Sequence, residues 1–151
     1  MRKERPAQPI DHRQAALDEI LALREALIIR GTERPVEYPG DREDATVHFG
    51  AFAGARNVAC ASFFLNEWFA ERAYQLRGMA TDPVFQGRGV GRALLEAAEK
   101  HFLQHTPARQ LWCSARVPAI GFYLALGWSL VSDEYDVANV GPHRKMCKRL
   151  Y

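Results

Sequence analysis

Six residues decide the fold of this chain: Gln86-Gly87-Arg88-Gly89-Val90-Gly91, set between a predicted strand and a predicted helix. Glycine adopts backbone dihedrals that other residues avoid, so its repetition here lets a ligand approach the main chain closely. The first amides of the following helix have no partners inside it, and the helix dipole adds partial positive charge at the same point. These features predict a phosphate-binding turn, to which Arg88 and Arg92 would add charge-assisted hydrogen bonds.

The spacing of the glycines excludes two common phosphate-binding motifs. A P-loop ends in Gly-Lys followed by Ser or Thr, whereas Gly91 is followed by Arg92 and Ala93. A Rossmann turn has the pattern G-x-G-x-x-G and an acidic residue about 20 positions later. Here the glycines stand at alternate positions, and Leu111 occupies the place of the acidic residue. The turn therefore belongs to another class of phosphate-binding site.

The succession of helical and strand patterns predicts one mixed α/β domain over residues 1–151, with residues 1–10 as a loose N-terminal arm. We expect a central mixed sheet of about six strands flanked by helices. The predicted strands are Thr46–Ala53, Asn57–Leu65, Ala73–Ala80, Gln110–Ala115, Ser129–Val137 and His143–Leu150, and the later helices are Gly89–Gln104 and Pro118–Leu126.

The N-terminal third of the chain predicts a helix followed by a long loop. Asp11 and Gln14 have the spacing of a capping box, and apolar residues recur at helical spacing over residues 17–28. Gly31 is a suitable C-terminal cap. The following segment, Thr32–Asp44, is rich in proline and charge, and a loop of this length usually has a function.

Composition and charge exclude several classes of protein. The net charge of +2 comes from scattered basic residues, which argues against a nucleic-acid partner. The three cysteines lack the spacing of metal ligands, so we expect no metal site and a reducing compartment. No run approaches the ~20 apolar residues of a membrane span, which predicts a cytoplasmic protein without a membrane partner. The basic run 143–149 is interpreted as a solvated edge strand, which would allow a homodimer.

Two stretches resemble the motifs of the GNAT superfamily, the acyl-CoA-dependent N-acetyltransferases. The first joins Leu76-Arg77-Gly78-Met79-Ala80-Thr81 to the turn Gln86–Gly91. The second is Ala119-Ile120-Gly121-Phe122-Tyr123-Leu124-Ala125-Leu126-Gly127-Trp128, which is similar to the family's pattern of Ala, then Tyr, then Leu-Gly-Phe. The resemblance covers roughly residues 15–150. It implies the GNAT fold, with acetyl-CoA as the cosubstrate.

The resemblance also assigns a cofactor-binding role to residues around the turn. The backbone of Met79, Ala80 and Thr81 would pair with the pantetheine arm of acetyl-CoA like an added strand. The amides of Gln86–Arg92 would hold the pyrophosphate. The strands on either side of the slot would splay apart, and Gly78 would permit the bulge that this requires.

For catalysis, the resemblance points to Tyr123 as the proton donor to the departing thiolate. A tyrosine with a pKa near 10 stays protonated at pH 7 and can donate to a thiolate. The attacking amine must be neutral, and the candidates for a general base are His143, His48, Glu134 and Asp136. His143 would titrate near neutral pH close to the acceptor pocket of the family. An exposed turn histidine is the alternative interpretation of His143, and His48 is interpreted chiefly as a locally paired strand residue.

The acceptor side follows no clear pattern. Glu134 and Asp136 in one predicted strand favour an acidic pocket that binds a cationic amine. Arg77 either faces an acidic group in the slot or covers the sheet. Arg116 stands where the family often has Asn, and it would contact a phosphate or the substrate. Cys113 is interpreted as an inert buried thiol, since a nucleophile would need a nearby His.

The sequence therefore predicts an N-acetyltransferase. It would transfer the acetyl group of acetyl-CoA to a primary amine of a small molecule or peptide, by direct attack in a ternary complex. The alternative is a catalytically weak, CoA-binding regulatory module of the same fold. Tyr123 favours the enzyme, whereas Arg116 and the lack of an obvious base keep the alternative open.

Overall fold

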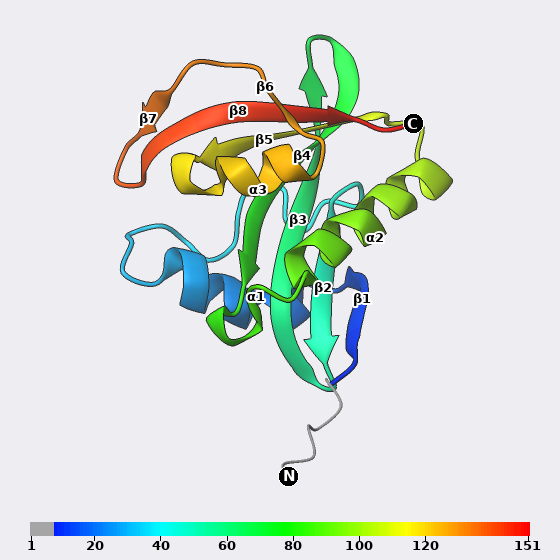
Figure 1. Ribbon diagram of the computed structural model, residues 1–151, viewed down its shortest axis with the longest axis vertical. Helices are drawn as coiled ribbons and strands as arrows, with labels where there is room; N and C mark the ends of the chain where they lie inside the picture. Colours follow the sequence, from blue (N-terminus) through cyan, green and yellow to red (C-terminus); the bar gives the residue numbers. More distant parts are fainter. Residues whose placement is uncertain (1–7) are drawn as a thin grey trace.

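A computed structural model describes residues 8–151 as one open sheet with helices on both faces (Figure 1). The strand order is β1-β2-β3-β4-β5-β8-β6, and β7 pairs with one end of β8. β4 and β5 are parallel neighbours, and the other neighbouring strands are antiparallel. The strands are β1 (Ile10–Ala15), β2 (Val47–Ala53), β3 (Arg56–Trp68), β4 (Glu71–Thr81), β5 (Gln110–Arg116), β6 (Ser129–Leu130), β7 (Tyr135–Val137) and β8 (Gly141–Arg149).

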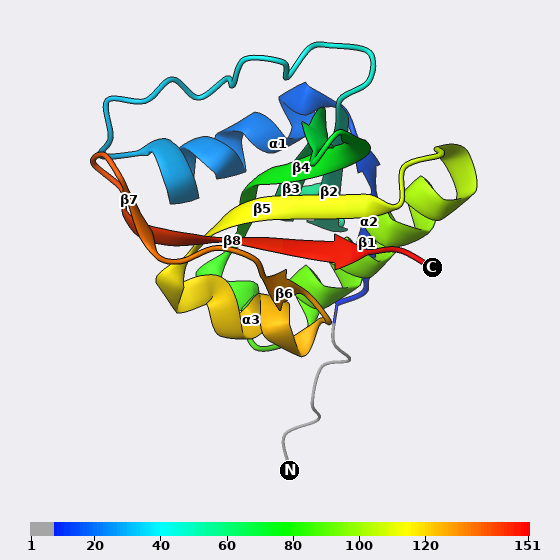
Figure 2. The same ribbon diagram turned by 90° about the horizontal axis from the view of Figure 1, so that it is seen from above.

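The helices divide between the two faces of the sheet, as Figure 2 shows. One face carries α1 (Leu17–Arg24), which continues into a π-helical turn, Glu25–Ile29. The other face carries α2 (Val90–His105) and α3 (Ile120–Ala125). Short 3-10 turns at Pro83–Phe85 and Val117–Ala119 precede α2 and α3. Within residues 8–151, no helix is long and apolar enough to cross a bilayer.

The expected mixed α/β fold is confirmed, and α2 forms the centre of its core. The ring of Phe102 packs against those of Phe63 and Tyr74, with centroids 5.0 and 4.4 Å away. Burial of each such side chain stabilises the fold by roughly 1.5–3 kcal/mol. The start of α2 is thereby held in a fixed position beside β4. The apolar face predicted for this helix is buried in full: Val90, Leu94, Leu95, Ala98 and Phe102.

The predicted N-terminus of the first helix is wrong. Residues 10–15 form β1, which pairs with β2 along its whole length, because this pairing satisfies their backbone groups. The helix begins later, and Asp11 does not cap it. Instead, the Glu19 carboxylate accepts a 2.8 Å hydrogen bond from the backbone N–H of Ala16. Of the predicted arm, residues 1–7 lie outside the described residues, and the rest leads into β1.

The sheet has eight strands rather than about six, and this changes its C-terminal side. The predicted strand 129–137 is divided into β6 and β7, because Ser132 between them accepts a hydrogen bond from the backbone N–H of Lys145. Both pieces pair with β8, so β8 lies between them and β5. The edge-strand interpretation of residues 143–149 is therefore wrong, and the argument for a homodimer loses its basis.

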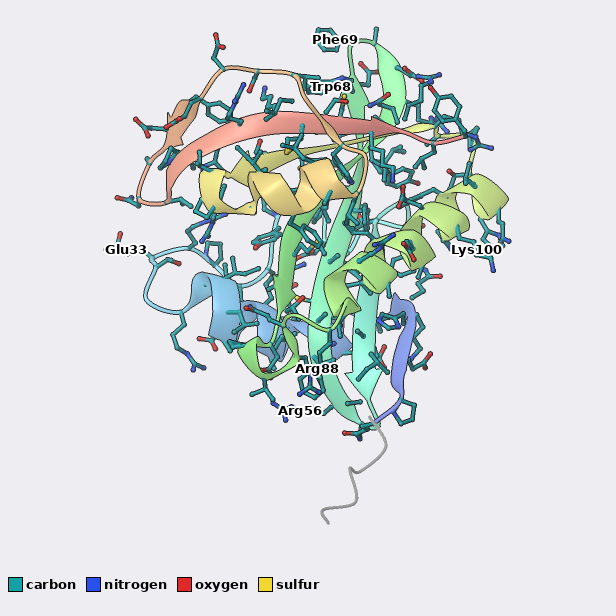
Figure 3. The ribbon with its side chains drawn as sticks, in the orientation of Figure 1. Glu33, Arg56, Trp68, Phe69, Arg88 and Lys100 are labelled. Atoms are coloured by element: carbon teal, nitrogen blue, oxygen red, sulfur yellow. The ribbon has the colours of Figure 1, made fainter. Side chains whose placement is uncertain are left out.

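The hairpin of β3 and β4 is longer than predicted. Its tip is a tight turn at Phe69 and Ala70, whose φ angles are 50° and 60°. Trp68 stacks on Trp112 of β5 with ring centroids 5.1 Å apart, and Figure 3 shows Trp68 and Phe69 at this tip. The stack ties the end of β3, at the tip of the hairpin, to β5.

A buried ion pair anchors the long loop after α1. Arg24 is 0% exposed, and its guanidinium forms a bidentate pair with Asp41 at 2.7 and 3.1 Å. The Asp41 carboxylate also accepts a 2.6 Å hydrogen bond from the backbone N–H of Tyr38. The Arg24 guanidinium lies 4.1 Å from the centroid of the Tyr38 ring. These contacts fold the loop predicted at 32–44 onto the sheet as a fixed wall.

Arg24 also begins a hydrogen-bond chain through two strands. It donates to Ser62 Oγ at 2.7 Å, and Ser62 Oγ lies 2.7 Å from His48 Nδ1. His48 Nε2 lies 2.9 Å from the backbone carbonyl of Asp41. Because a carbonyl can only accept, Nε2 carries a proton. His48 is therefore a locally paired strand residue, as expected, and both of its nitrogens are already engaged.

Replacing Asp41 with Asn should destabilise the protein by about 3–5 kcal/mol, because the buried Arg24 guanidinium would lose its counter-charge. Urea unfolding followed by circular dichroism measures the change in the free energy of unfolding. The control is Glu25→Gln, which removes the exposed Arg30–Glu25 ion pair and should cost less than about 1 kcal/mol. Equal losses in the two variants would contradict a structural role for the buried pair.

Candidate active site

The site begins where β4 and β5 stop pairing. The two parallel strands are neighbours over Tyr74–Leu76 and Leu111–Cys113 alone. Beyond this point, β4 continues to Thr81 against β3, and β5 continues to Arg116 against β8. The strands therefore splay apart as expected, and their facing edges carry backbone groups that no neighbouring strand uses.

A bulge at Gly78 accompanies the opening. The register of β4 against β3 shifts there, so two residues of β4 face one of β3. Gly78 has a φ of 64°, a conformation that favours glycine. A Cβ at this position would lie 3.1 Å from the Tyr38 ring and 3.3 Å from Arg24 Nε. Only glycine fits both the backbone and the close approach of the loop beneath it.

Two pockets meet at the opening. The turn pocket, of about 680 Å³, lies against the glycine turn and the start of α2. The slot pocket, of about 430 Å³, lies between β4, β5, the loop after α1 and the β7–β8 hairpin. The residues that line both are Met79, Ala80, Ala119 and Tyr123. Those that line the turn pocket alone include Thr81, Gln86, Gly87, Gly89, Val90, Gly91 and Arg92.

The glycine turn has the backbone that its sequence predicts. Gly87 and Gly89 have φ angles of 75° and 74°, and Gly89 is the N-terminal cap of α2. Inside the helix, the first N–H groups after Gly89 have no acceptor. Gln86 closes the turn, because its side-chain amide donates a 3.1 Å hydrogen bond to the carbonyl of Thr81. The N–H groups at the start of α2 belong to residues that line the turn pocket.

The two arginines of the turn lie in different places. Arg92 lines the turn pocket and pairs with Glu96 at 3.0 Å. Arg88 does not line this pocket, and its guanidinium lies 5.4 Å from the centroid of the Phe85 ring. Arg56 covers the same ring at 5.2 Å, and Figure 3 shows these two arginines together beyond the turn. Arg92 is therefore better placed than Arg88 for a ligand of the turn pocket.

Tyr123 projects from α3 into the wall between the two pockets. Its hydroxyl lies 3.7 Å from Met79 Sδ, a weak acceptor. The side chain is 7% exposed, and its ring packs edge-on against that of Trp128, with centroids 5.2 Å apart. Burial raises the pKa of the Tyr123 hydroxyl above its ordinary value, so the group keeps its proton at neutral pH. It can donate a proton to a neighbouring atom, and it is not a phenolate.

His143 lies on β8 opposite Arg116 of β5 and lines the slot pocket. The ring is buried, with Nδ1 2.8 Å from the backbone carbonyl of Gly141. This carbonyl can only accept, so Nδ1 carries a proton, and Nε2 is the ring nitrogen left for another partner. The interpretation of His143 as an exposed turn histidine is therefore wrong.

The acidic pocket expected from Glu134 and Asp136 is not formed. Both side chains are exposed, and neither lines the slot pocket. Val137 does line it, and successive residues of a strand point to opposite faces, so Asp136 points away from the face of Val137. The structure thus corrects the assignment of Glu134 and Asp136 to the acceptor site.

Arginines line the slot pocket instead. Arg77 is half-buried, and its guanidinium lies 4.6 Å from the centroid of the Tyr38 ring. Arg116 lines the slot pocket and not the turn pocket, so it lies away from the glycine turn. Arg34, from the loop after α1, is a third lining residue that the sequence reasoning did not identify. The unusual length of its loop was the one signal that could have indicated it.

Two of the described thiols are buried and have raised pKa values. Cys113 lines the slot pocket, but burial raises its pKa to about 12. Burial also raises the pKa of Cys60 to about 11. A thiol is nucleophilic as the thiolate, so Cys113 is a poor nucleophile at neutral pH. Across residues 8–151, no three His, Cys, Asp or Glu side chains gather in a way that could hold a metal ion.

The parallel strand pair that opens beside a phosphate-type turn is what the resemblance to acyl-CoA-dependent N-acetyltransferases implies, and known proteins agree. Residues 15–128 match the acetyltransferase (GNAT) family. The chain is 32% identical over 120 residues to the uncharacterized N-acetyltransferase YitI of Bacillus subtilis (strain 168), across 76% of this chain and 78% of that protein.

Solved structures show the same fold. ElaA of Escherichia coli has a TM-score of 0.80 and 18% identity, with 93% of this chain and 100% of that chain covered. An aminoglycoside 6′-N-acetyltransferase complexed with coenzyme A has a TM-score of 0.74 and 11% identity, with 93% and 97% covered. The chain therefore belongs to the GNAT family and is an acyl-CoA-dependent N-acetyltransferase.

Iodoacetamide at pH 8 should label Cys147 and leave Cys60 and Cys113 unmodified in the folded protein. With a pKa of about 12, Cys113 is thiolate in roughly one molecule in ten thousand at pH 8, and this fraction rises about tenfold per pH unit. Intact-protein mass spectrometry counts the adducts, and labelling in urea should modify all three cysteines. Rapid modification of Cys113 in the folded protein would contradict its assignment as an inert thiol.

Proposed function

We propose that the protein transfers the acetyl group of acetyl-CoA directly to a primary amine of a small molecule or peptide, with Tyr123 as general acid. The observation that carries the proposal is the wall shared by the two pockets, which contains Tyr123. An acyl donor in the turn pocket and an amine in the slot pocket would meet at this side chain. Holding two reactants together in this way favours direct transfer, without an acyl-enzyme.

The turn pocket fits the phosphates of an acyl-CoA. A Cβ built at Gly87 or Gly89 meets no other protein atom within 4 Å, so the space in front of the turn is open to a ligand. No Asp or Glu lines the turn pocket within residues 8–151, and Arg92 supplies positive charge. The N–H groups at the start of α2 complete an environment that suits a pyrophosphate. Acetyl-CoA would supply the acetyl group here as a thioester.

The opening also fits the pantetheine arm. Met79, Ala80 and Thr81 lie on the stretch of β4 that β5 does not pair with. An extended chain can add to such an edge by main-chain hydrogen bonds. Met79 and Ala80 line both pockets, so an arm bound along this edge would point toward Tyr123.

Two side chains could handle the protons of the reaction. A tyrosine keeps its proton at neutral pH, and burial raises the pKa of Tyr123 further; it would donate that proton to the leaving thiolate. His143 lines the slot pocket, and with its ring neutral Nε2 would accept a proton from the amine, directly or through a water. Cys113, whose pKa is raised, would remain a spectator.

Replacing Tyr123 with Phe should lower kcat by about 100-fold or more, since it removes the proton donor and keeps the ring. Release of CoA thiol from acetyl-CoA is measured over a panel of amines, and CoA affinity is measured by calorimetry. CoA affinity should stay within about twofold, because the substitution keeps the ring and leaves the glycine turn, where the pyrophosphate would bind, unchanged.

The matched control for Tyr123 is Tyr74→Phe, which removes another buried phenol that lines neither pocket and should leave kcat unchanged. Tight CoA binding without thiol release for any amine, unaltered by Tyr123→Phe, would instead identify a regulatory CoA-binding module.

Replacing Gly89 with Ala should weaken CoA binding and destabilise the fold by about 1–2 kcal/mol, because φ is 74° there. Calorimetry with CoA and with pantetheine, which lacks the pyrophosphate, separates the two effects. Only CoA should lose affinity. Gly121→Ala is the control, since Gly121 lies in α3 and lines neither pocket. Equal losses for CoA and pantetheine would argue against a phosphate site at the turn.

A further inference from the structure

Three arginines from three separate elements line the slot pocket. Arg34 comes from the loop after α1, Arg77 from β4 and Arg116 from β5. Arg77 is half-buried beneath the loop, whereas Arg116 is exposed. The three arginines therefore extend from the wall of the slot pocket to its rim.

None of these three arginines has a carboxylate partner within residues 8–151. Eleven ion pairs occur in this part of the chain, and all of them use other residues. No Asp or Glu of the described residues lines the slot pocket. Asp41, which lies close to Arg77, is bound to Arg24 and is fully buried. Glu33, the neighbour of Arg34, is exposed at the outer side of the loop (Figure 3).

Such a gathering of like charges is unfavourable unless an anion joins it. Burial lowers the pKa of Arg77, and the positive charges of Arg34 and Arg24 lower it further, against the opposing effect of Tyr38 and Asp41. Guanidinium groups form strong, often bidentate hydrogen bonds with carboxylates and phosphates. Three arginines without carboxylate partners in the described residues are therefore complementary to an anionic ligand.

We propose that the acceptor carries an anionic group, a carboxylate or a phosphate, on the same molecule as its primary amine. The proposal rests on the acetyltransferase function given above and names the substrate class of the same slot pocket. The anionic group would lie against Arg34, Arg77 and Arg116, which directs the amine toward Tyr123 and His143. Polyamines and other polycations would be repelled by the same arginines.

The proposal is tested with matched pairs of amines that differ in one charge. The pairs are an α-amino acid and its carboxamide, ethanolamine phosphate and ethanolamine, and glucosamine 6-phosphate and glucosamine, with spermidine added as a polycation. Thiol release from acetyl-CoA gives kcat/KM for each amine. In at least one pair the anionic member should be favoured by about tenfold or more, which corresponds to about 1.4 kcal/mol. The pair that shows the preference distinguishes a carboxylate from a phosphate.

Added salt and the removal of single arginine charges provide a second readout. The KM for the favoured anionic acceptor should rise between 50 mM and 500 mM NaCl, whereas that for its neutral partner should not, because salt screens charge attraction. Arg34→Gln, Arg77→Gln and Arg116→Gln should each reduce the anionic preference several-fold, with the KM for acetyl-CoA unchanged. Arg116 is exposed and Arg34 lies in a loop, so their variants keep the test valid if Arg77→Gln fails to fold.

The control for these variants is Arg72→Gln, which removes an exposed charge from the same strand as Arg77 and lines neither pocket. It should leave the anionic preference intact.

The outcomes separate this inference from the proposed function. Thiol release with neutral amines or spermidine equal to or faster than with anionic amines would overturn the inference and leave the acetyltransferase standing. An anionic preference that survives all three arginine variants would also overturn it. CoA binding without thiol release from any amine would overturn the proposed function itself, and this inference with it.

Discussion

The structure depends on one interruption: β4 and β5 pair over three residues and then part. Unused backbone groups cost free energy when they are buried, so strands separate in this way only where the surrounding structure forces them apart. Here the bulge at Gly78 turns β4 away from β5, and the loop held by Arg24 and Asp41 presses against that bulge from below. On the other side, β8 keeps β5 in place as far as Arg116. The opening thus belongs to the folded state of the protein itself.

The two sides of the opening were unequally predictable from the sequence. The side with the turn pocket is formed by the main chain of consecutive residues. Its strand, its glycines and the start of its helix therefore appear in the sequence as one continuous motif at 76–91, and this motif predicted the GNAT fold. Tyr123 was predictable for the same reason, because it stands in a second contiguous motif. Proposed roles for these residues still await experiment. The helix start at Asp11 was wrong because short-range capping patterns carry no information about pairing with β2.

The acceptor side could not be predicted in this way, because it is assembled from side chains of distant elements. Glu134 and Asp136 suggested an acidic pocket, yet the direction of a side chain in a short strand depends on register, which β7 acquires only by pairing with β8. Arg34 lines the slot pocket because the Arg24–Asp41 pair sets the position of the loop that carries it. Binding Asp41 to Arg24 also withdraws the nearest carboxylate from the slot pocket. The charge of this pocket is therefore decided by the tertiary fold.

The π-helical turn Glu25–Ile29 allows the wall of the slot pocket to change independently of the other segments around it. Leu27 and Ile28 of the turn line the slot pocket, and the loop with Arg34 follows directly. A π turn holds one residue more than the α-helical turn that it replaces. Deletion of one residue here would return the segment to α-helix and change which side chains of residues 25–29 face the slot pocket. β4, the glycine turn and α3 belong to other segments and would keep their places. One small deletion in this turn would therefore reshape the slot pocket and leave the turn pocket as it is.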